Sequence, residues 1–205
     1  MNRAAACALG LACLLSAGCA LRPTVPGTTV RWAQREAALL ALPGWELRGR
    51  LALRAADRSG QGRLRWRQQA DRGWLRVSGP FGAGAWELRW DRDAATLITG
   101  DGEQRSADGG PAALDRLLTR QFGWRLPAAQ ARYWVLGIPA PGSAARQRFG
   151  PDGWLAGIEQ GGWRIDYAGF RERDGHWIPR RLSIQRGGFR LKLVVDHWSV
   201  IAAAP

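Results

Sequence analysis

The chain has almost no lysine or histidine, and its cysteines are confined to one end. Lys192 is the only lysine, which excludes a P-loop because that motif places a lysine on the nucleotide phosphates. His176 and His197 lie far apart in the sequence, and no cysteine follows residue 19, so no familiar zinc-binding spacing is present. We therefore expect neither a nucleotide-driven motor nor a protein with a metal or another cofactor.

Motifs typical of catalysis are also missing. No serine lies in a Gly-x-Ser-x-Gly sequence, and the carboxylates are scattered without a dominant pair. The sequence Gly82-Ala83-Gly84 is not a dinucleotide-binding loop, because Glu87 stands where the third glycine would fall. The sequence therefore predicts a protein that is not an enzyme, although folding alone can assemble a catalytic triad from distant residues.

What the chain does contain is arginine, tryptophan and glycine. Its 205 residues include 30 Lys+Arg against 17 Asp+Glu, for a formal net charge of +13, and 46% of them are hydrophobic, with 12 Trp. This composition is far from that of a disordered chain, and the length suits one globular domain. The solvated face of a sheet is the simplest explanation of the arginines; nucleic acid, an acidic protein and anionic lipid headgroups are the alternative partners.

The first 18 residues have the pattern of a secretory signal peptide. Arg3 is followed by an uncharged, mainly apolar run that ends at Ala17, and this run is shorter than the ~20 residues that span a membrane. The protein should therefore be exported, which argues against nucleic acid as a partner. All three cysteines lie at or before residue 19, a distribution that does not suit a disulfide framework.

The last of these cysteines has a specific context. The segment Leu15-Ser16-Ala17-Gly18-Cys19 resembles the bacterial lipobox, in which the cysteine thiol receives a diacylglyceryl group and becomes the new N-terminus. Ser16 departs from the motif, which usually has leucine at that position. Ala20 is not the aspartate that retains such lipoproteins in the inner membrane, so the resemblance implies an outer-membrane destination. An ordinary signal peptide followed by a chance cysteine is the alternative.

We therefore divide the chain into a signal peptide at 1–18, a lipidated N-terminus and linker at 19–30, and a single domain at 31–205. Hydrophobic residues at helical spacing predict helices at 31–42, 111–122 and 127–136. Alternation of apolar and polar residues predicts strands, joined by short glycine-rich turns, at 45–54, 63–67, 74–78, 86–90, 154–158, 163–167, 182–185 and 189–195. The pattern is typical of a mostly β fold in which helices lie against the inner side of a curved antiparallel sheet.

The turn Gly79-Pro80-Phe81-Gly82 places a large aromatic side chain between two predicted strands. At the tip of such a turn Phe81 is poorly placed to reach the core, and leaving an apolar side chain in water costs ~1.5–3 kcal/mol relative to burial. We expect Phe81 either to insert into an apolar partner or to fold back onto the sheet.

Several motifs occur in the same order as in the LolB family of outer-membrane lipoprotein receptors, which the chain resembles over its mature length. They are the lipobox, the strand 45–53 with Gly49, Trp66-Arg67-Gln68-Gln69, Gly79-Pro80-Phe81-Gly82, Tyr133-Trp134 followed by Leu136-Gly137-Ile138-Pro139, the segment 163–167, and 190–193 with Trp198. The resemblance implies an incomplete, curved antiparallel β-barrel of about eleven strands, with a helical lid over an apolar cavity. It also implies a receptor that accepts triacylated lipoproteins from the periplasmic carrier LolA by binding their acyl chains, and incorporates them into the outer membrane.

The resemblance further implies roles for particular residues. It assigns membrane insertion to the loop Gly79, Pro80, Phe81 and Gly82, although the family commonly has leucine where this chain has Phe81. Apolar residues on the dry face of the strands would line the acyl cavity; the candidates are Leu51, Leu64, Trp66, Leu75, Trp86, Leu88, Trp90, Ile165 and Leu191.

The partners that the resemblance implies are LolA, client lipoproteins and outer-membrane lipid. We expect a monomer, anchored by its lipid and facing the periplasm, that binds no nucleic acid. The alternative is a passive outer-membrane lipoprotein that acts as a structural or protein-binding module.

Overall fold

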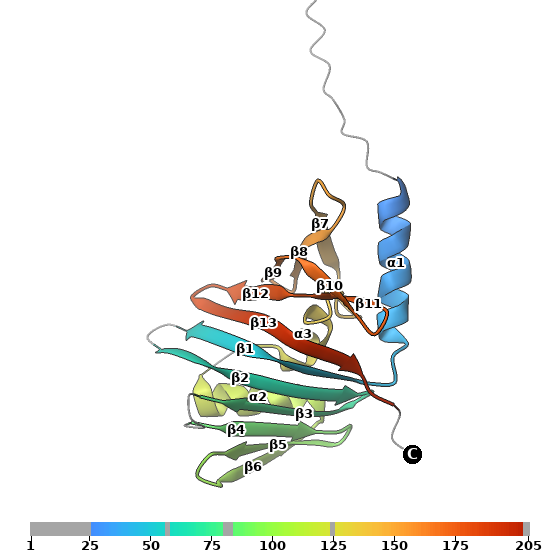
Figure 1. Ribbon diagram of the computed structural model, residues 1–205. Coiled ribbons are helices and arrows are strands. Elements are labelled where there is room, and N and C mark those ends of the chain that lie inside the picture. Colours follow the sequence, from blue (N-terminus) through green and yellow to red (C-terminus); the bar gives the residue numbers. More distant parts are fainter. Residues whose placement is uncertain (1–25, 56–57, 80–83, 124–125, 203–205) are drawn as a thin grey trace, which may run out of the picture.

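The computed structural model describes residues 26–55, 58–79, 84–123 and 126–202 (Figure 1). The predicted signal peptide, Cys19 and the loop residues Pro80, Phe81 and Gly82 lie outside the described residues, so the roles predicted for them stay predictions. Gly79 is the last described residue before that loop.

One antiparallel sheet of 11 strands dominates the fold, and a separate pair, β10 and β11, forms a small hairpin. The order in the large sheet is β6-β5-β4-β3-β2-β1-β13-β12-β9-β8-β7. The strands are β1 Trp45–Ala55, β2 Arg58–Gln69, β3 Arg72–Ser78, β4 Trp86–Trp90, β5 Ala94–Thr99, β6 Gln104–Asp108, β7 Ala145–Phe149, β8 Leu155–Gln160, β9 Trp163–Tyr167, β10 Phe170–Arg173, β11 His176–Pro179, β12 Arg181–Arg186 and β13 Phe189–Val200.

The first and last strands of the chain meet in the middle of the sheet. β1 pairs with β13 along its whole length, with a bulge between Arg48 and Gly49. At the bulge β13 approaches closely, since a Cβ on Gly49 would lie 2.3 Å from the carbonyl oxygen of Val194. Among the described strands β6 and β7 are left as edges and the sheet does not close, which confirms the predicted incomplete antiparallel barrel.

Three helices accompany the sheet: α1 Pro26–Leu40, α2 Pro111–Phe122 and α3 Ala128–Trp134. The segment that holds α2 and α3 joins the two edge strands, and it therefore crosses one face of the sheet (Figure 1). α2 has the predicted bounds, with proline in its first turn and Gly123 in the left-handed conformation at its end (φ 74°). The face that α2 and α3 cover is called the inner face below.

Some helix boundaries differ from the predictions. α1 begins at Pro26, so residues 26–30, which were predicted as linker, are helical. Proline suits the first turn of a helix because its φ is already fixed and its missing N–H is not needed there. α3 is shorter than predicted because the chain leaves the helix at Val135 and turns at Gly137 (φ 72°).

The sequence patterns also missed five strands, β5, β6, β7, β10 and β11. β6 and β7 are exposed edge strands, so they lack the alternation of apolar and polar residues that marks a half-buried strand. β10 and β11 have four residues each and pair only with one another. β13 continues to Val200, five residues beyond its predicted end at residue 195.

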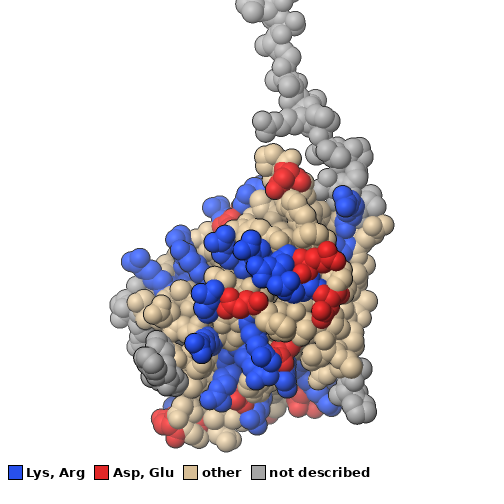
Figure 2. Space-filling view, viewed as in Figure 1, with Lys and Arg blue, Asp and Glu red and all other residues tan. Residues whose placement is uncertain are grey.

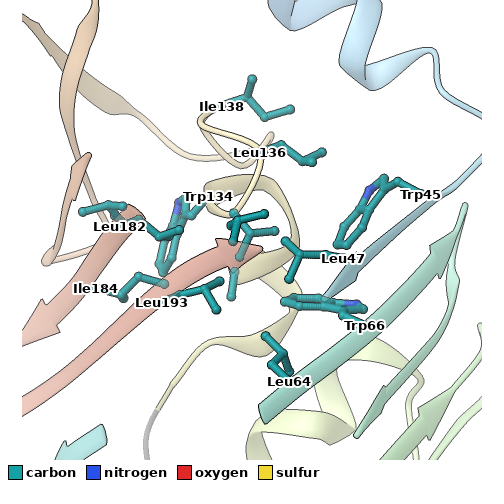
Figure 3. Packing of buried hydrophobic residues seen from close by; sticks show 14 of the residues in the cluster. Trp45, Leu47, Leu64, Trp66, Trp134, Leu136, Ile138, Leu182, Ile184 and Leu193 are labelled. Atoms are coloured by element: carbon teal, nitrogen blue, oxygen red, sulfur yellow. The ribbon is translucent and has the colours of Figure 1, made fainter. Parts of the chain in front are cut away.

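The core lies between the inner face and the segment around α3. Figure 3 shows side chains from both halves of the sheet converging on those that precede and follow Gly137: Trp45, Leu47, Leu64, Trp66, Leu182, Ile184 and Leu193 from the strands, and Trp134, Leu136 and Ile138 from the helical segment. The rings of Trp45 and Trp66 are 5.3 Å apart and those of Trp66 and Trp90 are 6.2 Å apart, a tilted row that runs across three strands.

On the opposite, outer face a carboxylate is held by three arginines. Glu46 is 7% exposed and accepts hydrogen bonds from Nε of Arg48 (2.6 Å), Arg65 (3.1 Å) and Arg67 (2.6 Å). Desolvation alone would raise the pKa of Glu46, but the three arginines outweigh it and lower the pKa to about 2. The folded state is therefore stabilised by the ionised form of Glu46.

We expect Glu46→Gln to lower the free energy of unfolding by about 1–2 kcal/mol at neutral pH, because it removes the charge that the arginines share. The contribution of Glu46 is complete above its ordinary pKa of 4.5 and is lost as the pH falls through about 2. The difference between the variant and the wild type should therefore narrow over that interval in urea titrations. Glu103→Gln, at an exposed pair with Arg105, is the control and should cost less than about 0.5 kcal/mol. If the difference in the free energy of unfolding between Glu46→Gln and the wild type did not change with pH, the role of the ionised carboxylate would be contradicted.

Candidate functional site

All nine candidate lining residues lie on the inner face of the sheet, and their role in binding acyl chains stays a prediction. Five are buried in the hydrophobic core: Leu64, Trp66, Leu88, Trp90 and Ile165. The other four are half-buried and pack against it: Leu51, Leu75, Trp86 and Leu191. The alternation in the sequence therefore identified the correct face of each strand, but it did not distinguish the sealed positions from the accessible ones.

The sealed positions leave no room for a ligand in this structure. Ile165 is 0% exposed and Leu88 is 1% exposed, so no water-sized space adjoins their side chains. At Ile165 and Leu88 the inner face is therefore closed by packed side chains. Binding there requires the helical segment to move away from the sheet.

Three of these four half-buried residues, Leu51, Trp86 and Leu191, lie at one end of the sheet, which we call the loop end. It contains the end of β1 and the start of β2, the end of β3 and the start of β4, the hairpin between β12 and β13, and the C-terminal turn of α2 (left side of Figure 1). Its half-buried apolar residues are Leu51, Trp86, Phe122, Phe189 and Leu191. The rings of Trp86 and Phe122 are 5.2 Å apart, so sheet and helix are in contact there.

Two glycines deepen the inner face near the loop end. Gly60 and Gly62 of β2 lie opposite Leu53 and Leu51 of β1, in phase with the inward-facing Leu64. A Cβ on Gly60 would meet no atom within 4 Å, whereas one on Gly62 would meet the backbone of β3. The inner face therefore has open space beside Gly60.

A pocket of about 800 Å³ also lies at the loop end. It is formed by the ends of β4 and β5 and by the last turn of α2, with Trp86, Ile98 and Phe122 as its large apolar residues. Its rim includes Arg76, Glu87 and Asp101. Gly84, which follows the predicted insertion loop, also lines it. A wide pocket with an apolar wall and a polar rim suits an amphiphilic ligand.

A second pocket, of about 420 Å³, lies at the other end of the sheet and differs in chemistry. Its lining is dominated by charged residues from two turns, namely Asp71, Arg72, Asp91, Arg92 and Asp93. Such a surface does not suit a hydrocarbon chain, because desolvating the charges would cost more than the apolar contact returns. The loop end is therefore the candidate site.

The helical segment over the inner face is tied together by a few buried polar contacts. Oδ1 of Asp115 in α2 accepts a hydrogen bond from the backbone N–H of Ala128 in α3 (2.8 Å), and burial raises the pKa of Asp115. Oε1 of Gln160 in β8 accepts hydrogen bonds from Nε1 of Trp134 and the N–H of Ala140, both at 2.9 Å. The hydroxyl of Tyr167 donates to the carbonyl of Trp134 (2.9 Å).

Arg35 connects α1 to this segment. Its guanidinium donates to the carbonyls of Leu136 and Gly137 (3.0 Å to the latter) and, through Nε, to that of Trp177 (2.9 Å). The guanidinium also lies 4.6 Å from the ring centroid of Trp32. Burial lowers the pKa of Arg35 to about 10, so it keeps its charge at neutral pH. Arg35 therefore fixes the turn after α3 to α1 and β11.

Sequence reasoning did not find Gly60, Gln160 or Arg35. Gly60 could have been noticed, because it lies four residues before the inward-facing Leu64 and so points to the same face of the strand. A glycine at such a position removes a side chain from the core. The partners of Gln160 and Arg35 lie up to 142 residues away along the chain, so no local pattern could indicate them.

Within the described ranges, no group of three or more His, Cys, Asp and Glu residues is arranged to hold a metal ion. None of the helices in the part of the chain that the structure describes is long and apolar enough to cross a membrane.

Comparison with known proteins relates this architecture to one family. The profile of the family described as "Outer membrane lipoprotein LolB" matches residues 43–198. A protein named Outer-membrane lipoprotein LolB from Stutzerimonas stutzeri is 36% identical over 191 residues, which cover 90% of each chain. One of the same name from Pseudomonas fluorescens is 34% identical over 190 residues with the same coverage. Among solved structures, a LolA superfamily protein from Nitrosomonas europaea gives a TM-score of 0.55 at 8% identity, over 85% of this chain and 94% of its own, which is a likeness of fold alone.

We expect Arg35→Gln to loosen the helical segment over the inner face. Losing the charged donor should lower the free energy of unfolding by about 1–3 kcal/mol, because the buried carbonyls of Leu136 and Gly137 would lose their partner. A pyrene-labelled fatty acid should then associate faster than with the wild type, which stopped-flow fluorescence would measure. Arg31→Gln, at an exposed position of the same helix, should leave both quantities unchanged. Equal association rates for all three proteins would exclude Arg35 as a restraint on opening.

Proposed function

Because this chain belongs to the LolB family of outer-membrane lipoproteins, we propose that it accepts lipoproteins by binding their acyl chains against the inner face and passes them into the outer membrane. The shared name of its relatives places the protein at the outer membrane as a lipoprotein. We further propose that LolA is the donor, that Cys19 carries the lipid anchor, and that the protein works as a monomer. The transfer involves no covalent step and needs no catalytic residue.

The observation that carries this proposal is the apolar opening at the loop end. Leu51 and Leu191 are half-buried beside the free space at Gly60, and Trp86 and Phe122 form the wall of the neighbouring pocket. From there the inner face continues into the sealed core without a polar interruption, since Leu51 pairs with Leu193 and Leu191 pairs with Ile184. An acyl chain that displaced the helical segment would therefore meet hydrocarbon along its path.

Hydrocarbon transfer needs such a continuous path because water is a large barrier. A triacylated lipoprotein has on the order of 40 methylene groups, and at ~0.8 kcal/mol each their exposure would cost about 30 kcal/mol. Free diffusion of the lipoprotein between carrier and membrane is therefore negligible. The acyl chains must pass from one apolar surface directly to the next.

The direction of transfer must come from differences in affinity, since the sequence contains no P-loop to couple nucleotide hydrolysis. α2 and α3 cover the inner face, with Leu114, Leu117 and Leu118 of α2 buried in the shared core. An incoming acyl chain has to replace these contacts. Competition with the helical segment weakens the binding of the acyl chain to the inner face. Release into a bilayer is favoured because no helical segment competes with the acyl chain there.

The loop Gly79-Pro80-Phe81-Gly82 is flanked by described residues that lie at the loop end. It joins β3 to β4, and the flanking residues Val77 and Trp86 are cross-strand partners on the inner face. We propose that Phe81 enters the lipid during release and so brings the opening to the membrane surface. The proposal assumes that a phenylalanine side chain inserts as well as the leucine common in the family.

Filling the space beside Gly60 tests the binding surface. We expect Gly60→Phe to reduce the affinity for a pyrene-labelled fatty acid at least tenfold, because the ring would occupy the space next to Leu53 and Leu191. The φ angle of Gly60 is outside the left-handed region, so a side chain adds no backbone strain. Fluorescence titration would give both affinities.

Gln61→Phe is the matched control, because it adds the same ring one residue along β2, where the side chain points to the outer face. It should bind the probe like the wild type. If the wild type does not bind the fatty acid at all, the interior is a finished core and the passive, protein-binding alternative is correct. If Gly60→Phe binds as tightly as Gln61→Phe, the acyl chain lies elsewhere.

Replacing the loop tip separates delivery from binding. We expect Phe81→Glu to leave the fold and fatty-acid affinity intact but to slow the incorporation of a lipoprotein into phospholipid vesicles at least tenfold, since a charge replaces a residue whose burial is worth ~1.5–3 kcal/mol. Leu40→Glu, at an exposed leucine of α1, controls for the general loss of surface hydrophobicity. If Phe81→Glu incorporated the lipoprotein into vesicles as fast as the wild type, the loop would have no role in membrane insertion.

A further inference from the structure

The outer face of the sheet carries an unusual concentration of arginine. Figure 2 shows this face, away from α2 and α3, with blue side chains spread across the strands and few red ones between them. We define the arginine face by the outward-facing cations of β1 to β4 and β13: Arg48, Arg50, Arg54, Arg63, Arg65, Arg67, Arg76, Arg89, Arg190 and Lys192. The carboxylates in ion pairs with these cations are Glu46, Glu87 and Asp196.

These carboxylates leave much of the positive charge uncompensated. Glu46 alone forms ion pairs with Arg48, Arg65 and Arg67, and Glu87 alone forms ion pairs with Arg76 and Arg89. No described carboxylate forms an ion pair with Arg54, Arg63 or Lys192, all of which are exposed. The arginine face therefore has a net positive charge that is open to solvent.

The register of the strands makes this charge costly for the fold. Arg50 lies directly opposite Arg63, and Arg54 directly opposite Arg190. Arg65 lies opposite Arg48 on one side and Arg76 on the other. Like charges at opposed positions of an antiparallel pair destabilise it. A local conflict of this kind, repeated over four strands, indicates that the charge is retained for an anionic partner and not for stability.

The chemistry of the arginine face favours a lipid surface over a protein. A specific protein interface needs an apolar, desolvated centre, whereas the outward positions of β1 and β2 carry mainly arginine, with Glu46, Ala52, a serine and two glutamines among them. Trp74 of β3 is the large aromatic residue on this face, half-buried, with the guanidinium of Arg65 5.8 Å from its ring centroid. Arginines spread over a broad surface beside a tryptophan are typical of contact with phospholipid headgroups.

We propose that the arginine face binds the anionic phospholipid headgroups of the outer membrane's periplasmic leaflet. Binding is electrostatic, acts through the summed field of many cations, and weakens as salt screens the charges. It is a third proposed contact with the membrane, separate from the lipid anchor and from the loop at Phe81. It rests on the outer-membrane location and not on acyl-chain binding, which takes place on the opposite face.

The test is vesicle co-sedimentation with the chain from residue 19 onward carrying Cys19→Ala, so that no lipid anchor contributes. The vesicles are phosphatidylcholine alone, and equal parts of phosphatidylcholine and phosphatidylglycerol. We expect binding only to the anionic vesicles, and a loss of that binding at high salt. The triple variant Arg54→Gln, Arg63→Gln, Lys192→Gln breaks no described ion pair and should bind at least tenfold more weakly, since each cation contributes about fivefold at low salt.

A second triple variant, Arg31→Gln, Arg105→Gln, Arg120→Gln, removes the same charge at exposed positions of α1, β6 and α2. It should bind like the wild type; an equal loss in both variants would show a general effect of net charge and overturn the proposal. Equal binding to neutral and anionic vesicles would also overturn it. The proposal would also be overturned if the first triple variant bound vesicles normally but accepted lipoproteins from LolA poorly. That result would assign the arginine face to an acidic protein. Fatty-acid affinity, measured in the same variants, should not change, so failure of this proposal is distinguishable from failure of the acyl-binding one.

Discussion

The apolar contact between the inner face and the helical segment is the interaction on which the rest of the structure depends. An open sheet of 11 strands has a broad hydrophobic surface, which α2, α3 and the turn after them cover, while Trp32 and Leu39 of α1 join the same core. Those helices cross from one sheet edge to the other, and contacts such as those of Arg35 and Gln160 hold the segment around α3 in place. A cover of this kind stabilises the sheet, yet it is the part whose displacement would expose a surface for hydrocarbon.

The sequence predicted the sheet well wherever a strand has one wet and one dry side. In β1 to β4 and β13 the alternation of arginine with leucine or tryptophan fixed both the strand and its inward face, since a shift of one residue would bury arginine. The same signal failed at β6 and β7, which lie at the edges with little to bury. It also failed at α1, where Pro26 reads equally well as linker or as a first helical turn.

The candidate site was predictable only in part, for a physical reason. Periodicity tells which face a residue occupies, but it does not tell how far that residue lies from an opening. Leu88 and Trp86 are two positions apart on one strand, yet the first is sealed and the second lines a pocket. That difference arises because Trp86 lies against Phe122 at the end of α2, and the position of that end depends on contacts between distant segments.

The strand pattern also links the two surfaces to which we assign function. Because successive side chains point to opposite faces, each leucine or tryptophan added to the inner face is followed by a residue that must suit the outer face. In this chain that residue is often arginine, so the strands that build the most apolar surface also build the most basic one. The repulsion among these arginines is offset partly by Glu46 and Glu87, whose carboxylates are nearly buried beneath them. An anionic membrane would offset the remainder, so the outer face would be less strained at the membrane than in free solution.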